Sequence, residues 1–289
     1  MKPVKKVVFP VAGLGTRMLP ATKVLPKEML PVVDKPIIQY ALEEAVAAGC
    51  EEFIFVTGRG KAIIEDHFDR AVELFEALAA KDKDEQLAEM TAEVPKAGQV
   101  LYTRQQEAKG LGHAVWCARQ LIQDEFFAVV LVDDLIHSQV PCLAQMIEAQ
   151  QQSGGNLVAV MEVAQEHTAR YGIVEPGVEE GRLVEVKSLV EKPDPAVAPS
   201  RYAVIGRYLL DAAIFDHLGR HEVGAGGEIQ LTDAMQRLIG SQPFHGFRFE
   251  GQRYDCGDKL GYLEAIVATA LARPDLGADF RAVLKRYVD

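Results

Sequence analysis

Short apolar runs recur along the chain and are continuous rather than alternating with polar residues. They cover residues 7–12, 53–57, 127–132 and 157–163. Continuous runs of this length are typical of strands that a parallel sheet buries on both faces. Amphipathic helical patterns lie between them, at 36–48, 112–122 and 142–152, and the first opens with Pro36 in a first-turn position and stops at Gly49. The order predicts an α/β fold with a doubly wound, mostly parallel, Rossmann-like sheet.

Two segments depart from this alternation. Residues 62–93 form a long, charged, Ala-rich helical stretch, which we expect to be an insertion on the surface. From about residue 171 the pattern becomes β-rich, with strands expected at 172–175, 183–190 and 202–207 and a turn around 176–181. Residues 260–272 and 279–288 are predicted to be helices. We therefore expect one domain over 1–289, built from a part of about 1–170, a smaller β-rich part at 171–257, and C-terminal helices at 258–289.

Composition narrows the classes of partner. The formal net charge of −11 provides no basic field for nucleic acid, although a small anionic substrate needs only a local cationic cluster. The four cysteines form no C-x-x-C pair, so a zinc cage or redox motif is not expected. No apolar run approaches the roughly 20 residues that span a bilayer, and the stretch 7–12 has no convincing cleavage site after it. We expect no membrane association and a cytoplasmic location.

A glycine-containing loop follows the first predicted strand. Its sequence is Ala12-Gly13-Leu14-Gly15-Thr16-Arg17, and glycines there let backbone N–H groups approach a phosphate. A dinucleotide fingerprint would need glycine where Met18 stands, and a Walker A loop would need a hydroxyl where Ala62 follows Lys61. Prolines keep the following segment from becoming helical, at Pro20, Pro26 and Pro31.

Two cations distinguish this loop from an ordinary turn. Arg17 lies two residues beyond Gly15, and Lys27 lies ten residues further on. Cations held beside a glycine cradle suit a triphosphate whose leaving pyrophosphate must be neutralised.

Carboxylates follow the apolar run 127–132. Asp133 and Asp134 stand where α/β folds place their ligands, and a buried carboxylate is costly unless it is paired or binds a metal. We predict Mg²⁺ ligation at Asp133, with a helix cap as the alternative, and Asp255 as the second carboxylate. Hard oxygen ligands without a His or Cys cluster suit Mg²⁺ bound together with substrate phosphates.

Three blocks of this sequence resemble the opening of the sugar nucleotidyltransferase family. They are Gly13–Arg17, the run Pro26-Lys27-Glu28-Met29-Leu30-Pro31, and Asp34–Tyr40, and they are most similar to the bacterial uridylyltransferase branch. The resemblance extends over essentially the whole chain. It implies an enzyme that makes UDP-glucose and pyrophosphate from UTP and glucose 1-phosphate with Mg²⁺, and a homodimer or homotetramer.

The resemblance also implies roles for individual residues. The nucleotide would be bound by Ala12, Gly13, Leu14, Gly15, Gln105 and Gly110, the last two at the pyrimidine edge. The part 171–257 would hold the sugar phosphate through Gly172, Glu191, Lys192, Val204 and Gly206. In this part Glu191 would bind sugar hydroxyls and Lys192 the phosphate. Asp133 matches the family's metal aspartate, although Val132 stands where Pro or Gly is more usual. The block Gly224–Asp233 also matches the branch, without individual roles.

The implied reaction is a direct in-line displacement. A phosphate oxygen of glucose 1-phosphate attacks the α-phosphorus of UTP, and a phosphate dianion needs no general base. Lys192 would orient the attacking phosphate, Mg²⁺ on Asp133 and Asp255 would bridge it to the α-phosphate, and Arg17 and Lys27 would steady the pyrophosphate.

Three alternatives stay open from the sequence. The first is the same chemistry with dTTP or another sugar 1-phosphate. The UTP and glucose branch is favoured over it by the insertion at 62–93 and the block Gly224–Asp233. The second is a non-catalytic regulatory relative, disfavoured by the intact Arg17, Lys27, Asp133 and Lys192. The third is a nucleotide-dependent dehydrogenase, disfavoured by Met18.

Overall fold

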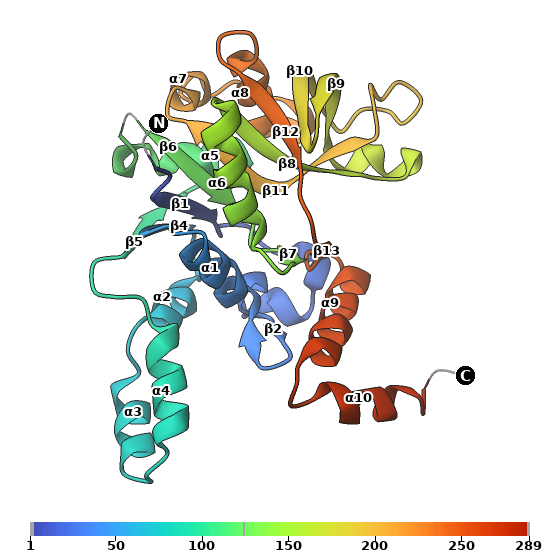
Figure 1. Ribbon diagram of the computed structural model, residues 1–289. Helices are drawn as coiled ribbons and strands as arrows, with labels where there is room; N and C mark the ends of the chain where they lie inside the picture. The colour runs from blue at the N-terminus through green and yellow to red at the C-terminus, as the bar shows by residue number, and fades with distance from the viewer. Residues whose placement is uncertain (1–2, 124, 288–289) are drawn as a thin grey trace.

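One large mixed sheet forms the centre of the computed structural model, which describes residues 3–123 and 125–287 (Figure 1). The strands in sheet order are β5 (Val100–Arg104), β4 (Glu52–Thr57), β1 (Lys6–Pro10), β6 (Phe126–Val130), β11 (Tyr202–Asp211), β8 (Asn156–Glu162), β12 (Phe244–Arg248), β10 (Leu183–Glu191) and β9 (Gly172–Glu180). Two short ribbons stand apart from it, β2 (Pro31–Val32) with β3 (Lys35–Pro36), and β7 (Asp134–His137) with β13 (Gln252–Asp255).

Strand pairing divides the sheet into two regions. β5, β4, β1 and β6 are parallel, as the apolar runs predict. β11 is antiparallel to both β6 and β8, and β10 is antiparallel to both β12 and β9, so the second region is mixed. The α/β fold class is confirmed, but the sheet is mixed rather than mostly parallel as predicted. β11 is buried along nearly its whole length, and antiparallel pairing permits burial on both faces as well as parallel pairing does.

Helices cover both faces of the sheet. The longer elements are α1 (Ile37–Ala47), α2 (Ala62–Phe68), α3 (Val72–Ala79), α4 (Asp84–Glu93), α5 (Leu111–Cys117), α6 (Cys142–Ser153), α7 (Ile214–Leu218), α8 (Leu231–Leu238), α9 (Lys259–Ala272) and α10 (Gly277–Leu284). One core joins the sheet to α1, α2 and α6, and the other joins it to α5, α7 and α8. Successive residues of β1 alternate between them, with Val7 and Phe9 in the first core and Val8 in the second.

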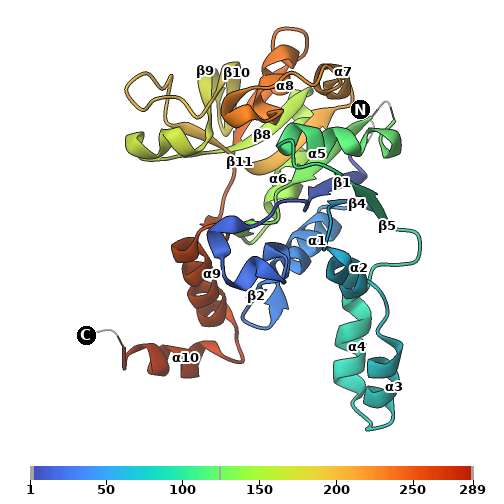
Figure 2. The ribbon, with the colours of Figure 1, turned by 180° about the vertical axis from the view of Figure 1, so that it is seen from behind.

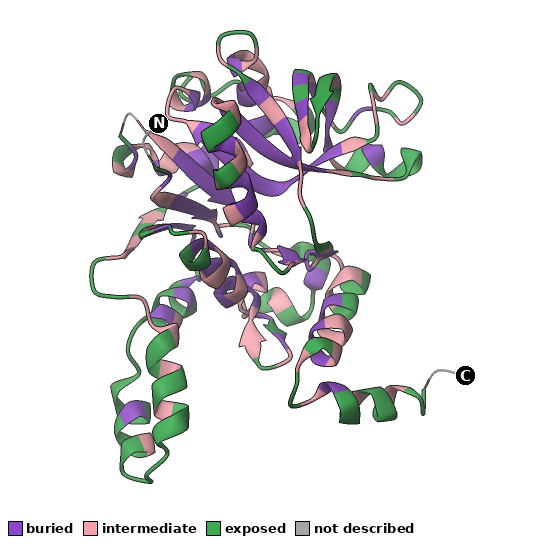
Figure 3. Ribbon diagram, viewed as in Figure 1, coloured by how far each residue is buried: buried purple, intermediate pink, exposed green. Residues whose placement is uncertain are grey.

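Two pairs of helices extend beyond the sheet, α3 with α4 and α9 with α10. The first pair forms an arm that is exposed along most of its length (Figure 3). In the second pair, α9 lies beside the β2–β3 hairpin, and the Tyr262 hydroxyl donates to the Pro31 carbonyl at 2.7 Å (Figure 2). No helix in the described ranges is both long and apolar enough to cross a membrane.

The structure corrects several element boundaries. The stretch 62–93 is three helices rather than one, and the first of them, α2, packs one face against the core through Ile64 and Phe68 while its opposite face stays exposed. β9 continues to Glu180, so the turn expected around 176–181 is confined to its end. Pro36 precedes α1 as its N-cap rather than occupying its first turn. The last helix ends at Leu284, and Val288, its expected end, lies outside the described residues.

Candidate active site

A cavity of about 450 Å³ lies beyond the carboxyl ends of β1 and β6. The residues that line it include eight of those predicted from the sequence: Arg17, Asp133, Gly172, Glu191, Lys192, Val204, Gly206 and Asp255. They come from distant parts of the chain and meet because β6 pairs with β1 on one side and with β11 on the other. Topology thus brings the glycine loop, the aspartate pair and the β-rich part to a single edge of the sheet.

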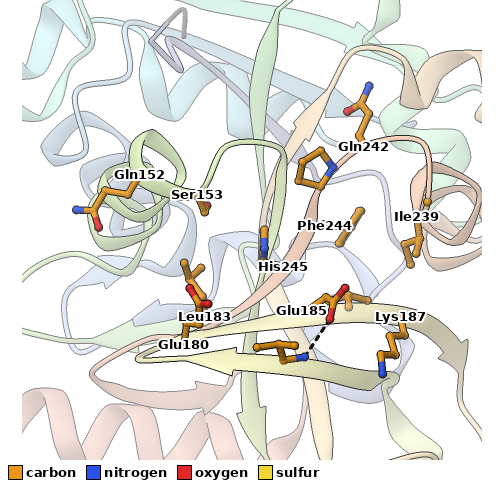
Figure 4. A pocket seen from close by; sticks show the side chains of 14 residues that line it. Gln152, Ser153, Glu180, Leu183, Glu185, Lys187, Ile239, Gln242, Phe244 and His245 are labelled. Carbon is orange, nitrogen blue, oxygen red and sulfur yellow. Dashed lines mark hydrogen bonds between the residues drawn. The ribbon is translucent and has the colours of Figure 1, made fainter.

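A larger hollow of about 930 Å³ lies elsewhere, against the outer strands of the sheet (Figure 4). Its lining includes Glu180, Glu185, Lys187 and His245, from β9, β10 and β12. None of the residues predicted from the sequence lines it. We therefore assign the candidate site to the smaller cavity, where the cationic, acidic and glycine residues converge.

The loop after β1 is irregular, as its prolines predict. It contains three single 3₁₀ turns, at Thr16–Met18, Ala21–Lys23 and Lys27–Met29. Gly15 has a φ of 65°, and a Cβ on it would lie 3.1 Å from the Lys27 Cβ. The Thr22 hydroxyl donates to the Gly15 carbonyl at 2.8 Å and fastens the turn. A left-handed glycine is needed here because the loop folds back closely on Lys27.

Lys27 and Asp133 form a direct ion pair. The ammonium nitrogen of Lys27 lies 2.5 Å from Oδ2 of Asp133. Burial opposes ionisation of Asp133, but the charge of Lys27 outweighs it and holds the pKa of this carboxyl below its usual value. Burial likewise disfavours the charged form of Lys27, and the carboxylates of Asp133 and Glu28 reverse the effect and raise the pKa of Lys27. Both groups are therefore ionised at neutral pH.

Behind Lys27 lies a second, buried ion pair. Lys61 donates to Glu28 Oε2 at 2.7 Å, and both side chains are almost fully inaccessible. Burial raises the pKa of Glu28 although Lys61 acts against it. Lys61, the lysine that comes nearest to a Walker A position in this sequence, is thus the ion-pair partner of Glu28, the residue that follows Lys27.

Gly257 marks the point where three functional side chains converge. A Cβ at this position would lie 2.7 Å from both Arg17 Nη2 and Asp133 Oδ2, and 3.2 Å from Asp255 Oδ1. Only glycine leaves this space free. Sequence reasoning missed Gly257, although it stands two residues after Asp255.

Asp134 has a structural environment quite unlike that of its neighbour. The guanidinium of Arg253 donates to Asp134 Oδ1 through Nε at 2.7 Å, and Oδ2 accepts the backbone N–H of Gly206 at 2.8 Å. Burial raises the pKa of Asp134 although Arg253 opposes the shift. Arg253 also donates to the Tyr171 hydroxyl at 2.9 Å and lies 3.5 Å from Asp255. Arg253 and Tyr171 both line the cavity, and no motif in the sequence identifies Arg253.

Glu191 and Lys192 are positioned by one hydroxyl and one unusual backbone angle. The Thr232 hydroxyl donates to Glu191 Oε2 at 2.7 Å, which accounts for one residue of the Gly224–Asp233 block. Lys192 has a φ of 47°, and its N–H donates to the Tyr171 carbonyl at 2.9 Å. A left-handed lysine costs of order 1 kcal/mol and is typical of functional positions. The Lys192 ammonium lies 3.4 Å from Glu191, and because this side chain is half-exposed it is also accessible to an anion.

Gln105 and Gly110 do not line this cavity but contact each other beside it. The Gln105 amide donates to the Gly110 carbonyl at 3.0 Å. Gly110 has a φ of 100°, and a Cβ on it would lie 2.6 Å from the Cβ of Glu228, which does line the cavity. Gln105 follows β5 directly, so it stands at the same edge of the sheet as the glycine loop.

The residues present fit a hard divalent cation. Among the described residues no group of three or more His, Cys, Asp or Glu side chains is arranged to hold a metal ion. Asp133 and Asp255 nevertheless present oxygens to the space that glycine leaves at position 257. Two carboxylates completed by substrate phosphates and water are a common Mg²⁺ environment.

The chain is similar to known proteins over most of its length. A family model described as nucleotidyl transferase matches residues 6–271. The chain is 52% identical to a UTP–glucose-1-phosphate uridylyltransferase of Komagataeibacter xylinus, over 90% of this chain and 92% of that protein.

Two solved structures are also similar over nearly the full length. A UTP-bound UGPase from Acinetobacter baumannii superposes with a TM-score of 0.90 and 41% identity, covering 97% of this chain and 98% of that one. A UDP-glucose pyrophosphorylase complexed with UDP-glucose has a TM-score of 0.84 and 43% identity, covering 93% and 100%.

Proposed function

Because this chain belongs to the nucleotidyl transferase family, we propose that it transfers the uridylyl group of UTP to glucose 1-phosphate. The products are UDP-glucose and pyrophosphate. The chain is thus an enzyme with the reaction that the names of the similar uridylyltransferases give. UTP and UDP-glucose, a substrate and a product of this reaction, are bound in two of the similar solved structures.

The observation that carries the proposal is the shared cavity. Arg17 and Asp133, from the loops after β1 and β6, line the same cavity of about 450 Å³ as Glu191 and Lys192. A nucleoside triphosphate on the glycine loop and a sugar phosphate beside Lys192 would meet at Asp133. Direct transfer between two bound phosphates needs this proximity and no covalent intermediate on the protein.

We assign the residues to the following roles. Lys192 binds the phosphate of glucose 1-phosphate, and Glu191, oriented by Thr232, accepts from sugar hydroxyls. One phosphate oxygen attacks the α-phosphorus of UTP, the bond from that phosphorus to the bridging β-phosphate oxygen breaks, and the electron pair leaves with pyrophosphate. Arg17 and Lys27 neutralise the negative charge that develops on the leaving group. No proton transfer is required.

Asp133 and Asp255 are the proposed ligands of Mg²⁺. Bound there, the ion would supply charge neutralisation to the phosphates. The neighbouring Lys27 lowers the pKa of Asp133 and so keeps this carboxylate in the ionised form that a cation requires. The homodimer or homotetramer, the cytoplasmic location, and the division at about residues 170 and 257 stay predictions.

A nucleotide panel tests the function. Pyrophosphate release is measured from UTP, dTTP, CTP, ATP and GTP with glucose 1-phosphate and Mg²⁺, and controls omit the metal or the sugar phosphate. Release with UTP well above the others, dependent on both additions, is the expected result. A preference for dTTP would move the chain to a sister activity, and a folded protein silent with every nucleotide would contradict the proposal.

The Lys192→Ala variant tests the sugar side. We expect the KM for glucose 1-phosphate to rise about 10- to 100-fold, because a hydrogen bond to a charged group is worth roughly 1.5–3 kcal/mol. The KM for UTP should change little. Lys187→Ala removes an exposed lysine from β10, the strand that Lys192 directly follows, and serves as the control. An unchanged KM for glucose 1-phosphate in Lys192→Ala would remove Lys192 from the site.

A further inference from the structure

The side-chain amide of Gln105 has both of its N–H bonds engaged within the protein. Nε2 lies 3.0 Å from the carbonyl oxygen of Gly110 and 3.0 Å from Nδ1 of His113. Oε1 has no hydrogen-bond partner among the described residues. It is not one of the fully buried polar atoms that lack a partner, so it keeps some contact with solvent. The oxygen is thus the end of the amide that stays open to a ligand.

The Gly110 carbonyl determines which end of the amide faces inward. A backbone carbonyl can only accept, so the group beside it must be the NH₂ of Gln105. The second N–H then points at His113 Nδ1, which must accept and cannot carry a proton. His113 is therefore neutral, with its proton on Nε2.

The surroundings of His113 favour this neutral form. Burial lowers the pKa of His113, and the charges of His221, Lys109 and Arg119 lower it further, against the opposing effect of Glu107. The ring stacks on Trp116, with centroids 5.8 Å apart, and meets His221 edge-on at 5.6 Å. The Cys117 sulfur lies 3.9 Å from the same Nδ1, where a thiol is only a weak donor. The ring is thus held in place by neighbours that compete at most weakly with the Gln105 amide for Nδ1.

The loop that carries Gly110 is held equally firmly. The Ile229 N–H donates to the Lys109 carbonyl at 2.8 Å, and the Gly112 N–H donates to the Ile229 carbonyl at 2.9 Å. Both acceptors of the Gln105 amide, the Gly110 carbonyl and the His113 ring, are therefore attached to α5 and to the segment before α8. An amide held by two fixed acceptors cannot exchange its ends without breaking both bonds.

We propose that His113 is a positioning residue for base selection, which locks Gln105 with its oxygen toward the base. The inference rests on the proposed function, in which Gln105 meets the pyrimidine edge. An outward oxygen accepts the N3–H of uracil and faces the unprotonated N3 of cytosine, where two acceptors repel each other. The lock thus discriminates UTP from CTP, while transfer chemistry takes place elsewhere, around Asp133.

The experiment compares His113→Leu with His113→Asn. Leucine fills the space without an acceptor, whereas the asparagine amide oxygen can replace Nδ1 in accepting from Gln105. For each variant we would measure the KM for UTP and the inhibition constant of CTP as a competitor of UTP. We expect the ratio of CTP inhibition constant to UTP KM to fall about two- to tenfold in His113→Leu, because one hydrogen bond of ordinary strength corresponds to roughly that range. His113→Asn should restore the ratio.

A Gln105→Ala background shows whether His113 acts through Gln105. Adding His113→Leu to it should leave the ratio unchanged, since the group that the lock orients is gone. A merely structural role would weaken UTP and CTP alike, or would add to the effect of Gln105→Ala, and either result would overturn the proposal. So would an unchanged ratio in a His113→Leu protein with wild-type thermal stability. Failure of the function itself is distinguishable, because the wild-type protein would then release no pyrophosphate from UTP.

Discussion

Asp133→Asn should lower the rate of UDP-glucose formation by a factor of at least about 10³, which corresponds to roughly 4 kcal/mol of transition-state stabilisation. The substitution keeps the shape of the side chain but removes its charge. Lys27, 2.5 Å away, then loses its partner, and the proposed Mg²⁺ site loses one of its two carboxylates. Steady-state rates with saturating UTP, glucose 1-phosphate and Mg²⁺ measure the effect.

The control for this experiment is Asp279→Asn, an exposed aspartate on α10. It should leave both the rate and the thermal midpoint unchanged. Asp133→Asn should also remain folded, because its carboxylate is only partly buried and its partner Lys27 can reach solvent. Turnover close to that of the wild type in the folded variant would contradict the assignment of Asp133 to the reaction and to the metal.

Arg207→Met should lower the free energy of unfolding by about 3–5 kcal/mol, the cost of leaving one member of a buried ion pair without its partner. Arg207 is bidentate with Glu44, at 3.0 and 2.7 Å, and the two side chains are only 1% and 9% exposed. The same guanidinium donates to the carbonyls of Leu131 and Asp134, on either side of Asp133. Chemical denaturation followed by circular dichroism measures the loss.

Two further variants separate charge from packing. Glu44→Leu combined with Arg207→Met should recover part of the lost stability, because no unpaired charge remains buried. Arg201→Met removes an arginine just before β11 whose partner, Glu162, is exposed, and it should cost no more than about 1 kcal/mol. Equal losses in Arg201→Met and Arg207→Met would show that burial of the pair is not the source of the stability.

The parts of the site that the sequence predicted share one property. The glycine loop, Asp133 and the Glu191–Lys192 pair each stand within a few residues of the end of a strand. Residues at the carboxyl ends of neighbouring strands meet at one edge of a sheet, so local patterns were enough to place Arg17 and Asp133 beside each other, whereas Lys192 was predicted only from the resemblance to the family.

The residues that sequence reasoning missed act through partners far along the chain. Arg253 binds Asp134, and Thr232 binds Glu191, across 119 and 41 positions respectively. Gly257 is required because three side chains from separate segments converge on it. His113 belongs to no functional motif of the sequence, and only the structure shows that its Nδ1 lies 3.0 Å from the Gln105 amide. A single sequence holds no periodicity that records such pairs.

The sequence by itself determined the α/β class, the buried strands and the irregular glycine loop after the first of them, because burial and backbone freedom depend on residues that are adjacent or regularly spaced. Only the tertiary structure decided the mixed pairing around β11, the different environments of Asp133 and Asp134, and the lock on Gln105. Strand order and hydrogen-bond partners depend on which distant segments pack together, and many arrangements satisfy the same local pattern. The fold selects one of them, and with it the charge that each carboxylate meets.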